Sequence, residues 1–173
     1  MVAPNNQRIV INNIEFAQKA LETHGTIPVL QFSRLVDLLN DGNGQVAWAL
    51  HGGKDIDGAV YLQLQVTGSL NVICQRCLQA MQYPLAIDVH YLLVQNESEL
   101  PAPEEEGDDA DYLLFQTEMS VLELVEDELL LTLPIAPKHE SGQCATESRA
   151  EVKLDEYKKP NPFARLEALK SKK

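Results

Sequence analysis

Hydrophobic and polar residues alternate through the middle of the chain, which is the period-two pattern of β-strands that bury one face. The alternation occupies residues 45–50, 60–72 and 85–94, and the connections between these segments are short. Consecutive strands with short connections usually pair antiparallel. We therefore predict an antiparallel meander within residues 45–95, joined by a short fourth strand at residues 112–115.

The first part of the chain has apolar residues at the three-to-four-residue spacing of amphipathic helices. One predicted helix starts near Ile14 and ends near His24 and Gly25. Ser33 can cap a second helix, which the Asn- and Gly-rich run at residues 40–44 would end. We expect at least one of these helices to cover the sheet.

The second half of the chain holds two further helical patterns. Residues 120–133 place Leu122, Val125, Leu129 and Leu133 on one face, so this helix is expected to pack on the sheet with its acids in solvent. Residues 161–170 give the second pattern, with proline at the first turn.

An acidic segment precedes these helices. Residues 97–111 contain eight acids, two prolines and no base. Such a segment buries too little apolar surface to fold, and we predict a mobile loop there.

Together these elements predict an α+β fold, an antiparallel meander or sandwich-like sheet with N-terminal, central and C-terminal helices. A length of 173 residues and a hydrophobic content of 45% suit one compact domain. We place that domain at residues 1–157, with the acidic loop inside it, and a basic C-terminal tail at residues 158–173.

The net charge of −12 is unevenly distributed. Residues 1–157 carry 8 basic and 25 acidic side chains, whereas residues 158–173 carry 6 basic and 1 acidic. RNA presents a dense row of phosphates, so the acidic body should repel it and only the tail can attract it. The charge pattern predicts that contact with RNA is indirect or runs through the C-terminal tail.

Membrane and enzyme functions find no support in the sequence. No apolar run reaches the roughly 18–20 residues that cross a bilayer, and the N-terminus lacks the segments of a secretory signal, so we expect a cytoplasmic protein with no membrane partner. No phosphate-binding glycine loop, nucleophile motif or catalytic carboxylate pair is recognisable. We therefore predict no catalytic residues, no small-molecule substrate and no enzyme activity.

The cysteines form the most informative chemical pattern. Cys74 and Cys77 frame a C-x2-C motif, and Cys144 follows His139 in a H-x4-C motif. Two thiols in a tight turn can bind one metal ion, and a distant imidazole and thiol can complete a tetrahedral set. These four residues are therefore candidate ligands for a structural zinc ion.

Two other interpretations of the same residues remain open. A reduced cytosolic protein with inert thiols fits the pattern, and the lack of a second C-x2-C motif favours it. A redox couple fits less well, since a thioredoxin-type motif opens a helix and this one joins two predicted strands.

The C-terminal tail carries the candidate partner-binding residues. Phe163, Leu166 and Leu169 recur at helical spacing among basic residues. Such a segment can dock in a groove on a partner or on the core of its own chain.

Four segments, in their order and spacing, resemble the YceD family of large-ribosomal-RNA-subunit accumulation proteins. They are Cys-Gln-Arg-Cys at residues 74–77, the acidic helix that leads to Leu-Pro-Ile-Ala-Pro-Lys-His at residues 125–139, Cys144, and Lys-Pro-Asn-Pro-Phe-Ala at residues 159–164 with its following leucines. The ordered set is more specific than any of its parts. The resemblance runs from the central hairpin to the end of the chain and leaves the first 45 residues without a match.

The resemblance implies a bacterial cytoplasmic protein that supports accumulation, processing or stability of large-subunit (23S) ribosomal RNA. It carries over no catalytic residue. Such a protein could be a non-enzymatic ribosome-biogenesis factor that acts through a ribosome-assembly or RNA-processing protein. Alternatively, it could bind RNA directly through its basic tail, or act as a metal- or redox-responsive regulator built on the cysteines.

Overall fold

The computed structural model describes residues 9–100 and 111–144 of the chain. The chain divides into two units, Met1–Lys138 and His139–Lys173. The first unit contains every helix and strand of the described residues. No helix in these ranges has the length and apolar character needed to cross a membrane.

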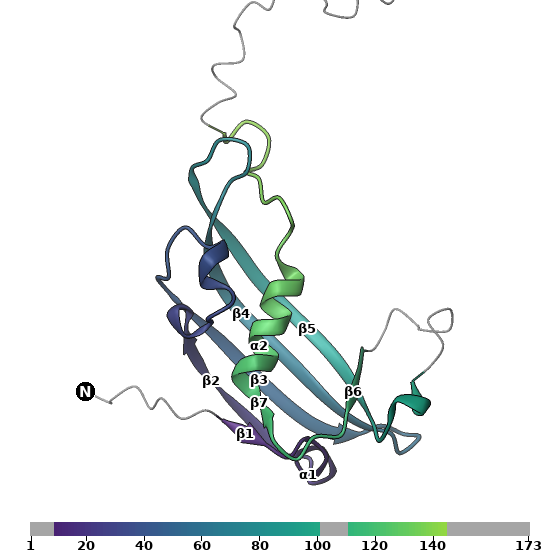
Figure 1. Cartoon of the computed structure of the whole chain (residues 1–173). Helices are drawn as coiled ribbons and strands as arrows, with labels where there is room; N and C mark the ends of the chain where they lie inside the picture. Colours follow the sequence, from purple (N-terminus) through teal and green to yellow (C-terminus); the bar gives the residue numbers. More distant parts are fainter. Residues whose placement is uncertain (1–8, 101–110, 145–173) are drawn as a thin grey trace, which may run out of the picture. The chain divides into compact units, whose positions relative to one another are not determined.

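The centre of the first unit is a five-stranded sheet (Figure 1). Its strands lie in chain order and, from the first to the fourth, neighbours pair antiparallel, which confirms the predicted meander. Side chains along the central strands alternate between buried and exposed positions, as a sheet with one covered face requires. The strands are β2 (Glu22–Pro28), β3 (Gln45–Lys54), β4 (Val60–Ile73), β5 (Ala80–Val94) and β6 (Asp111–Leu114).

The last strand departs from the prediction of a wholly antiparallel sheet. β6 pairs parallel with β5, with Tyr91 opposite Asp111 and Val94 opposite Leu114. A parallel neighbour requires a connection that returns to the starting end of the strand, and the chain between β5 and β6 is long enough to make that return. Alternation in the sequence identified the strand but could not give its direction.

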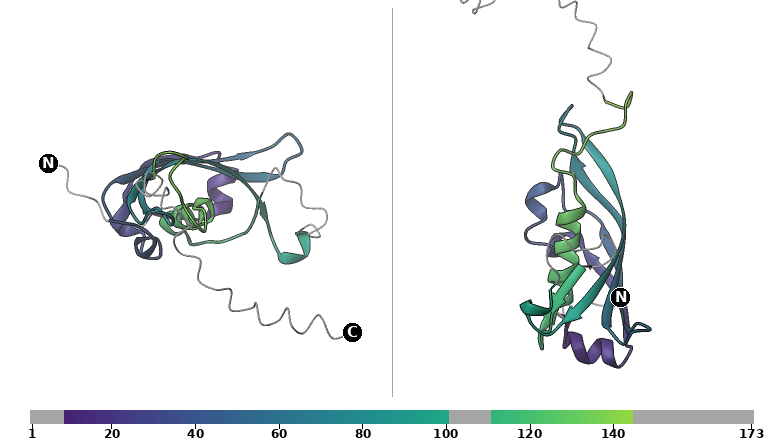
Figure 2. Two further views of the ribbon diagram at one scale, coloured as in Figure 1. Left: turned by 90° about the horizontal axis from the view of Figure 1, so that it is seen from above. Right: turned by 90° about the vertical axis from the view of Figure 1, so that its right-hand side faces the viewer.

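The helix α2 (Val121–Thr132) lies along one face of the sheet, as predicted for residues 120–133. Figure 2 shows the sheet on one side of this helix. Ser120 caps the helix, because its hydroxyl accepts a hydrogen bond from Glu123 N at 3.4 Å. The core contains buried residues of this helix and of the facing strands, among them Val46, Trp48, Leu50, Leu62, Leu64, Val66, Val121, Leu124, Val125 and Leu129.

The first predicted helix is shorter than expected. α1 (Asn13–Gln18) is followed by Ala20 in the left-handed region, with φ of 47°, and by a hydrogen bond from Leu21 N to Phe16 O at 3.0 Å. This turn ends the helix, and the next residues enter β2. The prediction that the helix continues to His24 and Gly25 is wrong, because these residues belong to a strand that pairs with β3.

The second predicted helix is also wrong. The 3₁₀ turn η1 (Val29–Gln31) precedes Ser33, and in place of the predicted helix the chain forms only the 3₁₀ turn η2 (Val36–Leu38). Leu39 then leaves the helical path and bridges Val72. Long-range pairing at both ends leaves this apolar segment too little length for a regular helix.

A small second sheet joins the N-terminal part to the start of α2. β1 (Val10–Ile11) pairs antiparallel with β7 (Met119–Ser120). The side chain of Asn13, which is fully buried, donates to Leu114 O at 2.9 Å and accepts from Gln116 N at 2.9 Å. These bonds fix the beginning of α1 against the segment that enters α2.

Part of the predicted acidic loop is ordered. Residues Glu97–Glu99 form the 3₁₀ turn η3, which Asn96 caps by accepting a hydrogen bond from Ser98 N at 3.1 Å. Asp111 already belongs to β6. The prediction for the rest of residues 97–111, and that of a helix at residues 161–170, lies outside the described residues.

Candidate functional site

The C-x2-C motif occupies the tight turn that joins β4 to β5. Cys74 N donates to Gln79 O at 2.9 Å, and Leu78 N donates to Cys74 O at 2.8 Å. Leu78 adopts a left-handed conformation with φ of 59°, which lets the chain reverse within so few residues. Cys74 is fully buried and Cys77 is half-buried. The motif joins two strands, as predicted, and does not open a helix as a thioredoxin-type couple does.

The end of the first unit lies beside this turn. Gln75 N donates to Pro137 O at 2.8 Å, a bond between residues distant in the sequence. A backbone N–H group of the turn therefore binds the segment that follows α2.

The H-x4-C motif forms a compact turn of its own in the second unit. Gln143 N donates to Glu140 O at 3.1 Å, and Gly142 has a φ of 86°, which favours glycine. The Sγ atom of Cys144 lies 3.8 Å from Nδ1 of His139. Cys144 is buried, although few apolar residues surround it in the sequence.

These two motifs supply one group of potential metal ligands. Cys74 and Cys77 of the first unit and His139 and Cys144 of the second unit each offer one ligand atom. None of these three cysteines, all within the described residues, forms a disulfide. Three thiols and one imidazole are a recognised ligand set for structural zinc, in which the protein fills all four positions. The group could hold a metal ion, and its members are those that the sequence predicts.

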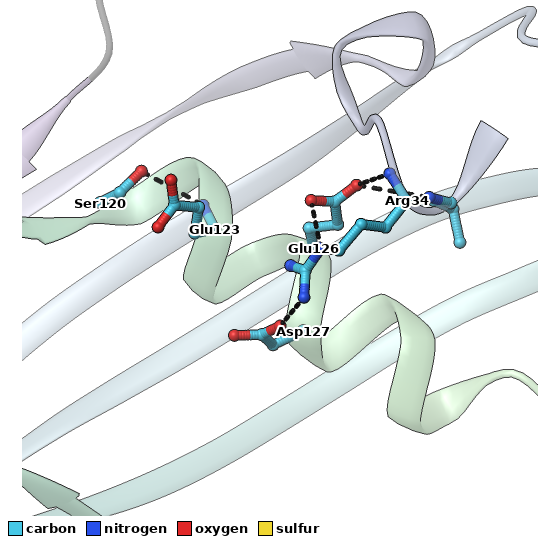
Figure 3. A network of polar contacts seen from close by, with 6 residues as sticks. Arg34, Ser120, Glu123, Glu126 and Asp127 are labelled. Carbon is cyan, nitrogen blue, oxygen red and sulfur yellow. Dashed lines mark hydrogen bonds and ion pairs between the residues drawn. The ribbon is translucent and has the colours of Figure 1, made fainter.

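A second polar cluster joins α2 to the segment between η1 and η2 (Figure 3). The buried carboxylate of Glu126 accepts hydrogen bonds from Arg34 N at 2.7 Å, Arg34 Nε at 3.0 Å and Leu35 N at 3.3 Å. Arg34 also contacts Asp127 at 2.6 Å, and these two acids raise the pKa of its guanidinium, chiefly through the bond to Asp127. The two carboxylates therefore hold the segment between η1 and η2 against α2.

The prediction that the acids of this helix face solvent is therefore wrong for two residues. Glu126 and Glu128 are both buried, with exposed fractions of 3% and 8%. The sequence could have predicted the burial of Glu126. It follows Leu122 by four positions, and residues four apart lie on the same face of a helix, here the face that packs on the rest of the fold.

Glu128 lines a groove of about 740 Å³ between α2 and the edge of the sheet. The hydroxyl of Tyr91, on β5, donates a hydrogen bond to Oε1 of Glu128. Burial raises the pKa of both groups, and the bond from Tyr91 partly offsets this rise for Glu128. No feature of the sequence indicated this groove. Its lining comprises Tyr91, Leu100, Asp111, Tyr112, Leu113, Leu124, Asp127, Glu128, Leu130 and Leu131.

The predicted partner-binding residues Phe163, Leu166 and Leu169 lie outside the described residues. Two of the histidines outside the ligand group make contacts with neighbouring side chains. His51 Nδ1 lies 3.3 Å from a carboxylate oxygen of Glu22, and the ring of His90 stacks on Tyr61 with centroids 4.6 Å apart.

Comparison with known proteins gives a consistent result. Residues 62–170 match the family model described as large ribosomal RNA subunit accumulation protein YceD. The chain is also 30% identical, over 172 residues, to the large ribosomal RNA subunit accumulation protein YceD of Haemophilus influenzae. That alignment covers 95% of this chain and 96% of the relative. No solved structure matches the chain.

Proposed function

The chain belongs to the YceD family of large ribosomal RNA subunit accumulation proteins, and we propose that it is a non-enzymatic cytoplasmic factor supporting large-subunit (23S) ribosomal RNA. The support consists of accumulation, processing or stability of that RNA. The observation that carries this proposal is the full-length similarity to a relative named for the same role.

We propose further that the protein acts through a protein partner, a ribosome-assembly or RNA-processing protein. The 25 acids and 8 bases of residues 1–157 create a field that opposes close approach of RNA. Phe163, Leu166 and Leu169, in the basic tail of residues 158–173, are the proposed contact residues. Three apolar side chains at helical spacing suit docking in a groove of a partner.

A complementation experiment tests this proposal. Cells that lack the gene would receive the wild-type chain, Phe163→Ala, or a variant in which Lys158, Lys159, Lys170, Lys172 and Lys173 are all changed to Gln. The level of 23S relative to 16S ribosomal RNA is the measurement. The wild type and the lysine variant should restore the level, whereas Phe163→Ala should not.

The opposite result identifies the alternative function. Restoration by Phe163→Ala and failure of the lysine variant, together with a steep salt dependence of RNA binding by the wild type, would mean that the tail binds RNA directly. Failure of the wild-type chain itself to restore 23S ribosomal RNA would contradict the family role.

We also propose that Cys74, Cys77, His139 and Cys144 bind one structural zinc ion. The support is a donor set of three thiols and an imidazole, two of them buried cysteines, in two separate tight turns. Zinc would link the β4–β5 turn to the H-x4-C motif, whose residues have few apolar neighbours in the sequence to hold them. With every position filled by protein, the ion would have a structural role.

Metal analysis of the purified full chain tests the zinc site. About one equivalent of zinc is expected, and Cys77→Ser or His139→Ala should lower the content severalfold. His24→Ala and His90→Ala are matched controls outside the ligand group and should keep the metal. Absence of metal from protein grown with zinc, with three freely titratable thiols in the folded state, would establish inert cysteines.

A further inference from the structure

The groove between α2 and the sheet edge has exposed apolar walls. Leu131 on α2 is 78% exposed and Leu100 is 39% exposed, and both line the same groove. Leu113 and Leu130 are partly buried beside them. Large exposed apolar side chains that gather at one groove are a common feature of surfaces that bind another molecule.

The charge of the groove has a single sign. Asp111, Asp127 and Glu128 contribute carboxylates to the lining, which has no lysine or arginine among the residues that the structure describes. Arg34 pairs with Asp127 from outside the groove and offsets one of these charges. Asp111 is exposed, so its charge faces any molecule that enters from solvent.

The sequence that connects two of the lining residues is also acidic. Residues 101–110 connect the lining residues Leu100 and Asp111, and they contain five acids and no base. Their charge opposes the occupation of an acidic groove by this segment, and it opposes RNA for the same reason. An occupant needs apolar side chains for the walls and positive charge for the carboxylates.

We propose that this groove binds a cationic amphipathic segment of a partner protein. Leucine-like side chains at helical spacing would pack against Leu100, Leu113 and Leu131, while lysines or arginines would lie near Asp111 and Asp127. A volume of about 740 Å³ suits a few side chains of a short segment. The proposal names the chemistry of a protein partner and so rests on the proposed function.

A defined peptide tests the binding chemistry without any RNA measurement. The probe is a fluorescent 14-residue peptide of leucine and lysine, with leucines at positions i, i+3, i+4 and i+7, and binding to the purified full chain is followed by anisotropy. Saturable binding is expected, and the matched peptide with glutamate in place of lysine should not bind.

Two leucine variants separate docking in the groove from general attraction to an acidic protein. Leu131→Lys should weaken binding at least tenfold. Leu38→Lys adds the same charge at another exposed leucine, which is 56% exposed and not part of the groove, and should retain most of the affinity. Both side chains are exposed, so both variants should fold, which equal unfolding temperatures would verify.

Three results would overturn the proposal. The first is that Leu131→Lys and Leu38→Lys weaken peptide binding equally, and the second is that the glutamate peptide binds tightly. The third is that the peptide binds more strongly to the variant in which the five lysines of the tail are changed to Gln. The last would mean that the chain's own basic tail occupies the groove. The readout of this experiment is peptide binding, whereas the proposed function is tested by the level of 23S ribosomal RNA in cells. The groove proposal can therefore fail while the proposed function stands.

Discussion

Glu126 is a buried carboxylate that holds two backbone donors from a distant part of the chain. It accepts from Arg34 N and Leu35 N, and Leu35 is fully buried. These donors would otherwise lack a partner, since the segment between η1 and η2 has no regular helix to use them. One side chain on α2 thus stabilises an irregular segment that its own sequence would fold as a helix.

Removal of this carboxylate should destabilise the protein. Glu126→Ala leaves two backbone N–H groups unsatisfied, one on a buried residue, and we expect the free energy of unfolding to fall by about 2–4 kcal/mol. Urea denaturation measures the change. Asp127→Ala is the matched control, because it also loses a contact with Arg34 but leaves no backbone group unsatisfied, and it should have little effect. Equal losses would mean that Arg34, and not the backbone, is the important partner.

Glu128 should make stability depend on pH in the opposite sense to an ordinary ion-paired acid. Burial raises its pKa above the usual 4.5, so the folded state holds this proton more tightly than the unfolded state does. The contribution of protonated Glu128 to the stability of the folded state is therefore complete below pH 4.5. This contribution is lost as pH rises through the higher pKa of the folded state.

Glu128→Gln removes this titration and retains an acceptor for the hydroxyl of Tyr91. Relative to wild type, the variant should therefore gain stability as pH rises from about 4 to 8, in urea denaturation at several pH values. Glu123→Gln, at an exposed position of the same helix, controls for the loss of a charge from α2. A constant difference between wild type and Glu128→Gln would contradict the raised pKa.

At the scale of elements, α1 and β3 approach each other closely at Gly52. A Cβ atom there would lie 2.6 Å from the Cα atom of Ala17 and 2.8 Å from the carbonyl oxygen of Phe16. Both are backbone atoms of α1, so the helix as a whole would have to move. The strand predicted at residues 45–50 ended before this contact, whereas β3 runs on through Gly52 and Gly53.

Gly52→Ala should therefore lower the free energy of unfolding by about 1–3 kcal/mol, the usual range for an overpacked contact. Gly25→Ala, on β2, is the matched control. Its new Cβ atom would meet only the ring of Trp48, at 3.3 Å, which can shift by a few tenths of an ångström. Urea denaturation should show the larger loss for Gly52→Ala, and a smaller loss than for Gly25→Ala would contradict this account of the contact.

Local patterns predicted the strands and α2 well, because each signal comes from a face that a single element buries. The period-two pattern of residues 60–72 corresponds to β4, and the stripe at residues 120–133 corresponds to α2. The segment after Ser33 has the same kind of helical spacing, yet it forms only a 3₁₀ turn because Glu126 and Val72 bind its ends. The spacing of apolar residues reports only the local preference for a helix. It does not show which distant residues will compete for the same backbone groups.

At the scale of the whole molecule, the proposed zinc site and the hydrophobic core involve different residues. Cys74 and Cys144 are buried but do not belong to the main apolar cluster, which includes Trp48. Classical zinc fingers unfold without their metal because they lack such a core. Here the apolar cluster includes none of the four proposed ligands, so we expect it to stay folded without metal.

Removal of the metal with a strong chelator should therefore lower the unfolding temperature but leave the sheet folded. The expected readouts are an unchanged far-ultraviolet circular dichroism spectrum and unchanged emission from Trp48, the chain's single tryptophan, at a temperature below the transition. Addition of zinc should reverse the shift. Emission of an exposed tryptophan after chelation would show instead that the core depends on the metal.

Residue types and their spacing were sufficient to determine much about this protein. They gave the mixed α+β character, the meander of β3, β4 and β5, the acidic body, and the four candidate ligands Cys74, Cys77, His139 and Cys144. Each of these follows from a local property. A strand shows the face that it buries, charges add along the chain, and metal ligands must be thiols or imidazoles whatever the fold.

Tertiary structure alone decided the direction of β6, the burial of Glu126 and Glu128, and the groove between α2 and the sheet edge. Each depends on which distant segments meet. A carboxylate at a given position of a helix is solvated or buried according to its neighbour in space, and here Arg34, Leu35 and Tyr91 provide the donors. The sequence contains those donors but does not specify their pairing, because pairing is settled by the packing of the whole first unit.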